Sequence, residues 1–180
     1  VSKTLEDINE ENIEEVIKTI TDSYDQNRMI FIIGNGGSAA AATHFAQDLS
    51  KGTRLNLDVV KRIKAMSLTD NLSFITALGN DDGYDTVFEQ QLRTFSDRGD
   101  LLIAISGSGN SPNIIKAIEW ANDNGIKTIG FTGFDGGKLK VLNSINVHVP
   151  LDDMETVESI HAIIFHYIIL RLKEIVFDNN

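Results

Sequence analysis

Short apolar runs alternate with segments of helical periodicity along most of the chain. Residues 4–24 carry apolar side chains at roughly helical spacing with Glu and Asp between them, which predicts a surface helix that includes Leu5 and Ile8. Apolar runs predict five strands, at residues 29–33, 64–68, 101–105, 128–132 and 146–149. Because residues 101–105 are all apolar, we expect a central strand there that is buried on both faces.

Helices are predicted between these strands and after the last one, at residues 39–49, 72–78, 87–95, 112–122 and 155–176. Thr69 or Asp70 is a candidate cap for the second of these helices. Ser111 before Pro112 is a strong start signal, because serine caps helices and proline suits the first helical position. The last helix is apolar around much of its circumference, so we expect it to be buried in part against another subunit.

Strands that alternate with helices predict an α/β fold with one five-stranded parallel sheet, covered by helices on both faces through right-handed crossovers. No repeat or linker divides the chain, so we expect a single domain over residues 1–180. Ligands of such sheets bind at the carboxyl ends of the strands. Two glycine- and serine-rich loops, at residues 34–38 and 106–111, follow the first and third strands at that edge.

Composition and charge exclude several classes of function. The chain has 180 residues, with 16 Lys and Arg against 26 Asp and Glu, and its formal charge of -10 argues against binding nucleic acid or an anionic membrane through bulk charge. It has no cysteine, which excludes a thiolate metal cluster or nucleophile and fits a reducing cytoplasm. No run reaches the about 18 apolar residues of a membrane span, and the acidic N-terminal segment is unlike a secretory signal. We expect a soluble, cytoplasmic protein.

The serine-rich loop has the composition of a phosphate site. Ser106, Ser108 and Ser111 lie between a strand and a helix, where backbone N–H groups, hydroxyls and the helix dipole favour an anion. The loop lacks the Lys-Ser/Thr of a Walker A motif and the G-x-G-x-x-G spacing of a dinucleotide fold, which disfavours nucleotides. The alternative is an ordinary glycine-rich crossover turn.

Four titratable residues are candidates for chemistry. His44 and Asp48 are four apart on one predicted helix face, where they bind one metal or one substrate, or make a solvated structural contact. Glu158 and His166 are eight apart, roughly 80° around a helix, so they converge only loosely. We interpret His161 as a structural histidine, and Trp120 as a packing residue.

The ordered motifs of the chain resemble those of the sugar isomerase (SIS) superfamily and, within it, the phosphoheptose isomerases. The resemblance covers nearly the whole chain and includes GNGGSAA at 34–40, TALGND at 76–81 and SGNSPN at 108–113. Further matching segments are 44–46, 83–84, 87–88, 99–100, 105–106, 132–133, 135–139 and 149–150.

The resemblance implies a homotetramer with active sites at subunit contacts, which converts sedoheptulose 7-phosphate to D-glycero-D-manno-heptose 7-phosphate. It implies one Zn²⁺ per site, held by His44, Asp48, Glu158 and His166, with Asp48 as the general base and His166 as its acid/base partner. It assigns the phosphate and sugar contacts to Asn35, Gly36, Gly37, Ser38, Asn71, Ser106, Gly107, Ser108, Ser111 and Glu158.

The chain departs from the family pattern at several of these positions. Asp48 replaces a glutamate and shortens the reach of the base, whereas Glu158 replaces a glutamine and adds charge to the metal set. We interpret these two changes as compensating. The family arginine aligns with Gly52, for which Lys51 or Arg54 is a candidate replacement. The acid three before His44 aligns with Ala41, and another family acid aligns with Asn71.

Three functions remain open from the sequence. The leading hypothesis is aldose–ketose isomerisation through an enediol, with proton transfer by Asp48 and His166 and a carbonyl polarised by Zn²⁺. The departures at Gly52 and Asn71 leave open an isomerase of another phosphosugar. The superfamily also contains non-catalytic members, so a phosphosugar-sensing or replication-initiator-binding protein is the third hypothesis.

Overall fold

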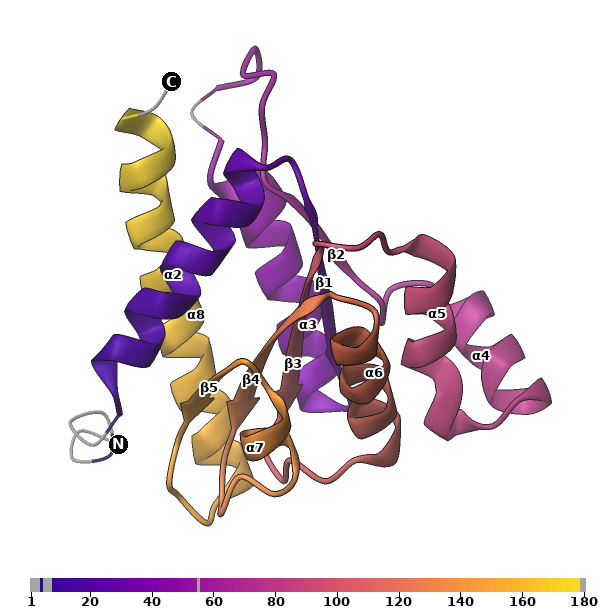
Figure 1. The fold of residues 1–180 in the computed structure, drawn as a ribbon. Helices are drawn as coiled ribbons and strands as arrows, with labels where there is room; N and C mark the ends of the chain where they lie inside the picture. The colour runs from indigo at the N-terminus through magenta and orange to yellow at the C-terminus, as the bar shows by residue number, and fades with distance from the viewer. Residues whose placement is uncertain (1–3, 5–7, 55, 179–180) are drawn as a thin grey trace.

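Five strands form one parallel sheet, as the sequence predicts, and their order in it is β2-β1-β3-β4-β5 (Figure 1). The computed structural model describes residues 4, 8–54 and 56–178. The strands are β1 (Met29–Gly34), β2 (Lys64–Ser67), β3 (Leu101–Ser106), β4 (Lys127–Thr132) and β5 (Ile145–His148). All six residues of β3 are buried, which confirms the predicted central strand. In the parallel register, Ala104 of β3 pairs with Ile33 of β1 and with Gly130 of β4, so the carboxyl ends of these three strands lie at the same edge of the sheet.

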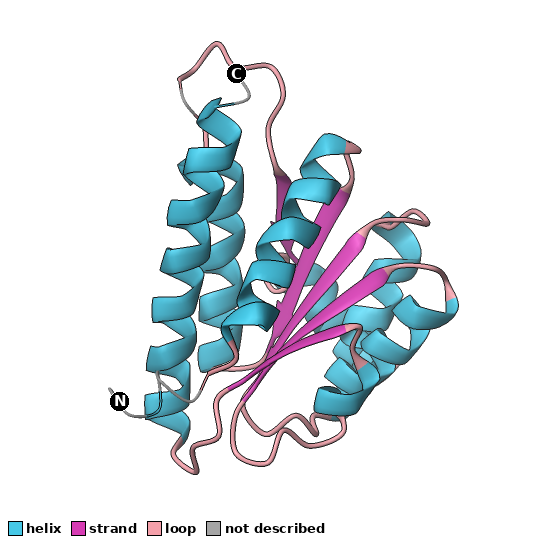
Figure 2. Cartoon of the chain, turned by 60° about the vertical axis from the view of Figure 1, so that its left-hand side comes forward, coloured by secondary structure: helices cyan, strands magenta, loops and turns pink. Residues whose placement is uncertain are grey.

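Helices cover both faces of this sheet (Figure 2). One face packs against α2 (Glu10–Asp25), α3 (Gly37–Gln47) and α8 (Met154–Asp178). The other face packs against α5 (Val87–Phe95), α6 (Pro112–Asp123) and α7 (Leu139–Leu142), while α4 (Leu72–Asp81) lies on α5. Successive side chains of β1 point to opposite faces, so Ile30 and Ile32 belong to the first core and Phe31 and Ile33 to the second. Trp120 packs against the second core, as expected.

Several helix ends differ from their predicted positions. α2 begins at Glu10, after Asn9, whose side chain accepts a hydrogen bond from the Glu11 N–H at 2.9 Å. Ile8, which the sequence predicted inside this helix, lies before its start. The predicted residues 5–7, including Leu5, lie outside the described residues. The cap of α4 is Asn71, which accepts from the Phe74 N–H at 3.1 Å, so the prediction of Thr69 or Asp70 is wrong.

Two helices have surfaces that the rest of the described chain does not cover. α4 buries none of its residues, and Leu72 is 72% exposed. On α8 the side chains of Ile163, Tyr167 and Leu170 are exposed, although the helix also supplies much of the first core. Within the described part of the chain, no helix has both the length and the apolar content of a transmembrane span.

Candidate active site

The site is built on two helices that pack side by side in the same direction. Phe45 of α3 stacks on Phe165 of α8, with ring centroids 4.5 Å apart. Near their N-terminal ends, Gly37 of α3 lies against Glu158 of α8. Polar side chains gather at two levels along this helix pair. One level, with Ser38 and Glu158, lies near the carboxyl ends of the strands, and the other, with His44, lies farther along α3.

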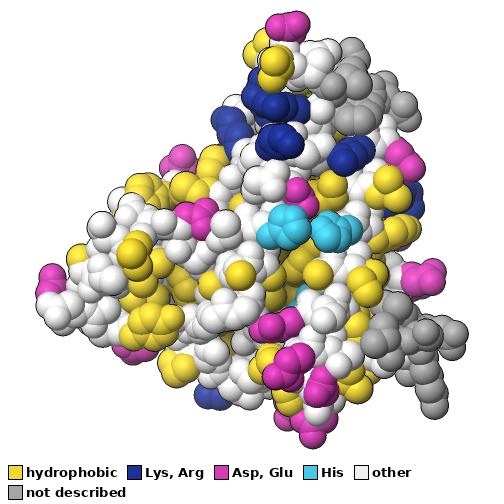
Figure 3. Space-filling model, turned by 180° about the vertical axis from the view of Figure 1, so that it is seen from behind, with side chains coloured by type: hydrophobic (Ala, Val, Ile, Leu, Met, Phe, Trp, Pro, Cys, Tyr) yellow, Lys and Arg dark blue, Asp and Glu magenta, His cyan; other side chains and the backbone are white. Residues whose placement is uncertain are grey.

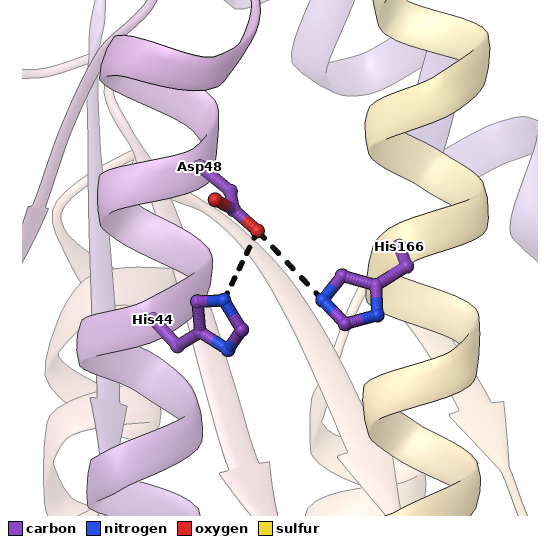
Figure 4. Close-up of side chains that lie close together, drawn as sticks. All are labelled: His44, Asp48 and His166. Atoms are coloured by element: carbon purple, nitrogen blue, oxygen red, sulfur yellow. Dashed lines mark ion pairs between the residues drawn. The ribbon is translucent and has the colours of Figure 1, made fainter.

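At the farther level, the structure brings His44, Asp48 and His166 together (Figure 4). The Asp48 Oδ2 atom lies 3.4 Å from His44 Nε2 and 3.9 Å from His166 Nε2. One ligand atom from each of the three residues lies within 4.8 Å of the others. The two imidazoles are 58% and 59% exposed and the carboxylate 22%, so the group opens to solvent.

Local structure explains why these three side chains meet. His44 and Asp48 are four residues apart on one helix face, and the hydrogen bond from the Asp48 N–H to the His44 carbonyl keeps that spacing. After Gln47 the helix widens into a π-helical turn, η1 (Asp48–Gly52), a feature often found at functional sites. Two imidazoles and a carboxylate are the donor types that Zn²⁺ and related divalent ions prefer.

Glu158, predicted as a fourth ligand, is not part of this group. Eight residues of α8 separate it from His166, which is about 12 Å along a helix axis. Its carboxylate lies instead against Gly37, at the first residue of α3. The spacing along α8 therefore places Glu158 at the other level of the site.

That other level is a pocket of about 170 Å³ at the carboxyl ends of β1 and β3. Both α3 and α6 begin at this pocket, and helix N-termini attract anions. Ser111 occupies the N-cap position of α6 as predicted, but its side chain makes no capping hydrogen bond. The pocket is lined by Asn35, Ser38, Ile105, Ser106, Gly107, Ser108, Ser111, Met154 and Glu158.

A network of side-chain hydrogen bonds that the sequence did not reveal joins the first glycine loop to the start of α6. The side chains of Asn35 and Asn113 donate a hydrogen bond to each other's carbonyl oxygen, each at 2.9 Å. The Tyr84 hydroxyl also donates to Asn35 Oδ1, at 3.0 Å. Asn113 is 2% exposed, and only its place in the matched SGNSPN motif distinguished it in the sequence.

Other predicted residues lie away from the pocket. The Asn71 side chain is used as the cap of α4, and the neighbouring Asp70 accepts a hydrogen bond from Thr43 of α3 instead. Gly52 lies beside Asp48, close enough that a Cβ atom on this glycine would be 3.7 Å from the carboxylate. Among the described residues, neither Lys51 nor Arg54 forms an ion pair with Asp48. Lys and Arg side chains nevertheless gather on this face above the two histidines (Figure 3).

The remaining histidines of the described chain are not part of either level. His161 is 1% exposed, and its Nε2 atom lies 3.3 Å from the Thr132 carbonyl. Burial lowers its pKa to about 4, so it is neutral at pH 7, as expected of a structural histidine. Burial also lowers the pKa of His148, whose Nδ1 atom lies 3.0 Å from the Thr132 hydroxyl.

Known proteins are similar to this chain in sequence and in fold. The family model of the SIS domain matches residues 1–133. The phosphoheptose isomerase of Aliarcobacter butzleri is 40% identical over 168 residues, which are 93% of this chain and 87% of that protein.

Two solved structures of phosphoheptose isomerases have the same fold. The protein from Neisseria gonorrhoeae has a TM-score of 0.82 and 32% identity, over 91% of this chain and 86% of its own. The protein from Francisella tularensis has a TM-score of 0.85 and 29% identity, over 96% of this chain and 90% of its own. Sequence and structure therefore point to the same group of proteins.

Proposed function

Because this chain belongs to the SIS domain family and, within it, to the phosphoheptose isomerases, we propose that it isomerises sedoheptulose 7-phosphate to D-glycero-D-manno-heptose 7-phosphate in heptose biosynthesis. The observation that carries this proposal is the two-level site on α3 and α8. An anion pocket lies at one level, and a carboxylate with two imidazoles lies at the other. From Gly37 to His44 the helix rises about 10 Å, which is comparable to an extended seven-carbon sugar phosphate.

The serine pocket binds the phosphate and orients the sugar chain along the helix pair. Ser106, Ser108 and Ser111 supply hydroxyl donors, and the first N–H groups of α3 and α6 supply further donors. Binding energy from this remote end holds the reacting carbons beside Asp48. The Asn35–Asn113 pair fixes the first glycine loop relative to the start of α6.

Asp48 and His166 carry the proton transfers. The Asp48 carboxylate removes a proton from carbon 1 of the ketose and returns it to carbon 2 after the enediol has formed. His166 gives a proton to the oxygen on carbon 2 and takes one from the oxygen on carbon 1, so it ends as it began. The 3.9 Å between the Asp48 and His166 side chains supports this assignment, because both groups can then act at the same end of the sugar.

A divalent metal fits the same group. Within one subunit, His44, Asp48 and His166 would hold it, and their nitrogen and oxygen donors suit Zn²⁺. When bound, the ion would polarise the substrate carbonyl and stabilise negative charge on its oxygen.

Variants at the two proton-transfer residues test the assignment. We expect Asp48→Asn and His166→Ala to abolish turnover of sedoheptulose 7-phosphate while an unreactive phosphate ester still binds, measured by calorimetry. Asp58→Asn, at an exposed position, is the matched control and should keep full activity. Turnover retained in both site variants would contradict the assignment.

Metal binding has a separate test. Zn²⁺ titrated into chelated protein should bind once per site, and His44→Ala should weaken binding by removing one imidazole. Glu158→Gln leaves His44, Asp48 and His166 intact, so the affinity of this variant for Zn²⁺ should match that of the unchanged protein. A large loss of affinity in Glu158→Gln would show that the glutamate joins the metal set.

A different phosphosugar is the second candidate substrate. The placement of the Asn71 side chain in the cap of α4 supports it, because a sugar contact expected from the family is engaged elsewhere. Incubation with sedoheptulose 7-phosphate, fructose 6-phosphate and other ketose phosphates, with and without Zn²⁺, distinguishes the substrates.

We also propose that the protein is a homotetramer that acts in the cytoplasm, where phosphorylated sugars are held. The exposed Ile163, Tyr167 and Leu170 of α8 support assembly, because large apolar side chains rarely gather on a surface without a partner. Light scattering should give a mass four times that of one chain. A monomer at micromolar concentration would contradict this part of the proposal.

A further inference from the structure

The serine pocket has an unusual charge for a phosphate site. Two helix N-termini and several hydroxyls converge on it, which favours an anion. Among the described residues that line the pocket, none is a lysine or arginine, and the single charged side chain is the acidic Glu158. A site built for an anion therefore already contains one.

Glu158 lies where an anion would bind at the start of α3. Both of its carboxylate oxygens are so close to Gly37 that a Cβ atom on that residue would overlap them. Gly37 is the first residue of α3, and a negative charge at this place is favourable to the helix dipole. The side chain is half-buried, so solvent screens it only in part.

Within the described residues, no cation or hydrogen-bond donor is paired with Glu158. The hydroxyls of Ser38 and Ser111 also have no hydrogen-bond partner among these residues, although Ser38 is 5% exposed. The carboxylate and the free hydroxyls thus line the same small pocket. A ligand that fits it must donate hydrogen bonds to the carboxylate and accept them from the hydroxyls. An ionised carboxylate can only accept hydrogen bonds.

Resting on the phosphate site proposed above, we propose that Glu158 is a specificity-determining residue that selects phosphorylated sugars over small free anions. A free anion such as inorganic phosphate meets the repulsion of the carboxylate and offers only its P–OH hydrogens in return. A phosphorylated sugar meets the same repulsion, but its hydroxyl groups donate hydrogen bonds to the carboxylate and offset it. The glutamate thereby keeps the pocket open to substrate when inorganic phosphate is abundant.

The test compares inorganic phosphate with a sugar phosphate in three proteins: the unchanged chain, Glu158→Gln and Glu155→Gln. Glu158→Gln keeps the shape of the side chain and removes its charge. Glu155→Gln removes the same charge one turn earlier on α8, at an exposed position outside the pocket lining. Calorimetry gives Kd for inorganic phosphate, and steady-state kinetics give KM for sedoheptulose 7-phosphate.

We expect Glu158→Gln to bind inorganic phosphate about five- to tenfold more tightly, since one like charge at close range is removed. The KM for the sugar phosphate should fall by a smaller factor than this Kd, or should rise. The ratio of Kd for inorganic phosphate to KM for the sugar phosphate therefore falls. Glu155→Gln should leave both constants unchanged. The inference would be overturned if Glu158→Gln bound inorganic phosphate no more tightly than the unchanged chain, or if Glu155→Gln gave the same increase. It would also be overturned if Glu158→Gln improved Kd for inorganic phosphate and KM for the sugar phosphate by the same factor.

The result also separates this inference from the proposed function. If no sugar phosphate is turned over by the unchanged protein, the proposed isomerase activity fails. Tighter binding of inorganic phosphate in Glu158→Gln alone would then still establish that the glutamate opposes free anions in this pocket.

Discussion

The amide pair of Asn35 and Asn113 makes the sharpest prediction about how the site is held together. Asn113→Ala removes the two side-chain hydrogen bonds of 2.9 Å to Asn35, each contributing about 1 kcal/mol. It also removes the bond from the Ile114 N–H to Asn113 Oδ1 at 3.0 Å, which adds little because that N–H donates to the Ser111 carbonyl as well. It also leaves the Asn35 Nδ2 donor without its acceptor, which adds roughly 1 kcal/mol for a half-buried group. The Tyr84 hydroxyl still satisfies Asn35 Oδ1, so that atom adds nothing.

The expected loss is therefore about 3 kcal/mol in the free energy of unfolding, measured by urea denaturation at fixed protein concentration. For a chain of this length, that corresponds to a midpoint of thermal unfolding lower by roughly 6–12 °C. The KM for the sugar phosphate should rise as well, because the two segments that line the proposed phosphate pocket are no longer linked by hydrogen bonds.

A double-mutant cycle with Asn35→Ala isolates the pair. Because each single variant already breaks both hydrogen bonds, the double variant should cost less than the sum of the two, by about 1 kcal/mol or more. Strictly additive losses would refute the reasoning, since they would mean that the two amides do not depend on each other.

Two further predictions concern buried or strained positions. His161 has a folded-state pKa of about 4, below the about 6.5 of an unfolded histidine, so its contribution to stability is present above pH 6.5 and is lost as the pH falls toward 4. His161→Leu should remove roughly 2 kcal/mol of the acid destabilisation between pH 7 and pH 5, and identical urea midpoint shifts in both proteins would contradict this. Gly109 has φ +63°, and a Cβ there would overlap the Gly136 carbonyl, so Gly109→Ala should cost about 2–4 kcal/mol and weaken phosphate binding. At Gly36 (φ +54°, ψ -122°) an added Cβ meets no atom within 4 Å, so Gly36→Ala isolates the backbone strain, about 1–3 kcal/mol, and should cost less than Gly109→Ala.

The strand pattern could be predicted because burial leaves little choice. A run such as 101–105, apolar at every position, fits only a strand covered on both sides, and β3 is buried throughout. Helix starts were harder where several residues can cap. Thr69, Asp70 and Asn71 are equivalent as caps in the sequence, but the first two are engaged with Thr43 of α3, which leaves Asn71 for α4.

The site could be predicted where it depends on local spacing and not where it depends on helix packing. His44 and Asp48 share a face by their four-residue spacing alone. The approach of His166 depends on how α8 packs on α3, where Phe45 stacks on Phe165. Spacing along the chain could not predict this approach, and only the family resemblance grouped His166 with His44 and Asp48. The same packing places Glu158 beside Gly37, a contact between residues more than a hundred positions apart that no local pattern encodes.

The bare surface of α4 has a consequence for the dynamics of the protein. No side chain of this ten-residue helix is fully buried, so it is held mainly by its own hydrogen bonds, the Asn71 cap, the contact of Phe74 with Phe95, and the partly buried Ile75 and Leu78 on the second core. In the isolated chain the amide protons of α4 should exchange with deuterium far sooner than those of β3. Slow exchange along α4 in solution would thus report that a neighbouring molecule covers it.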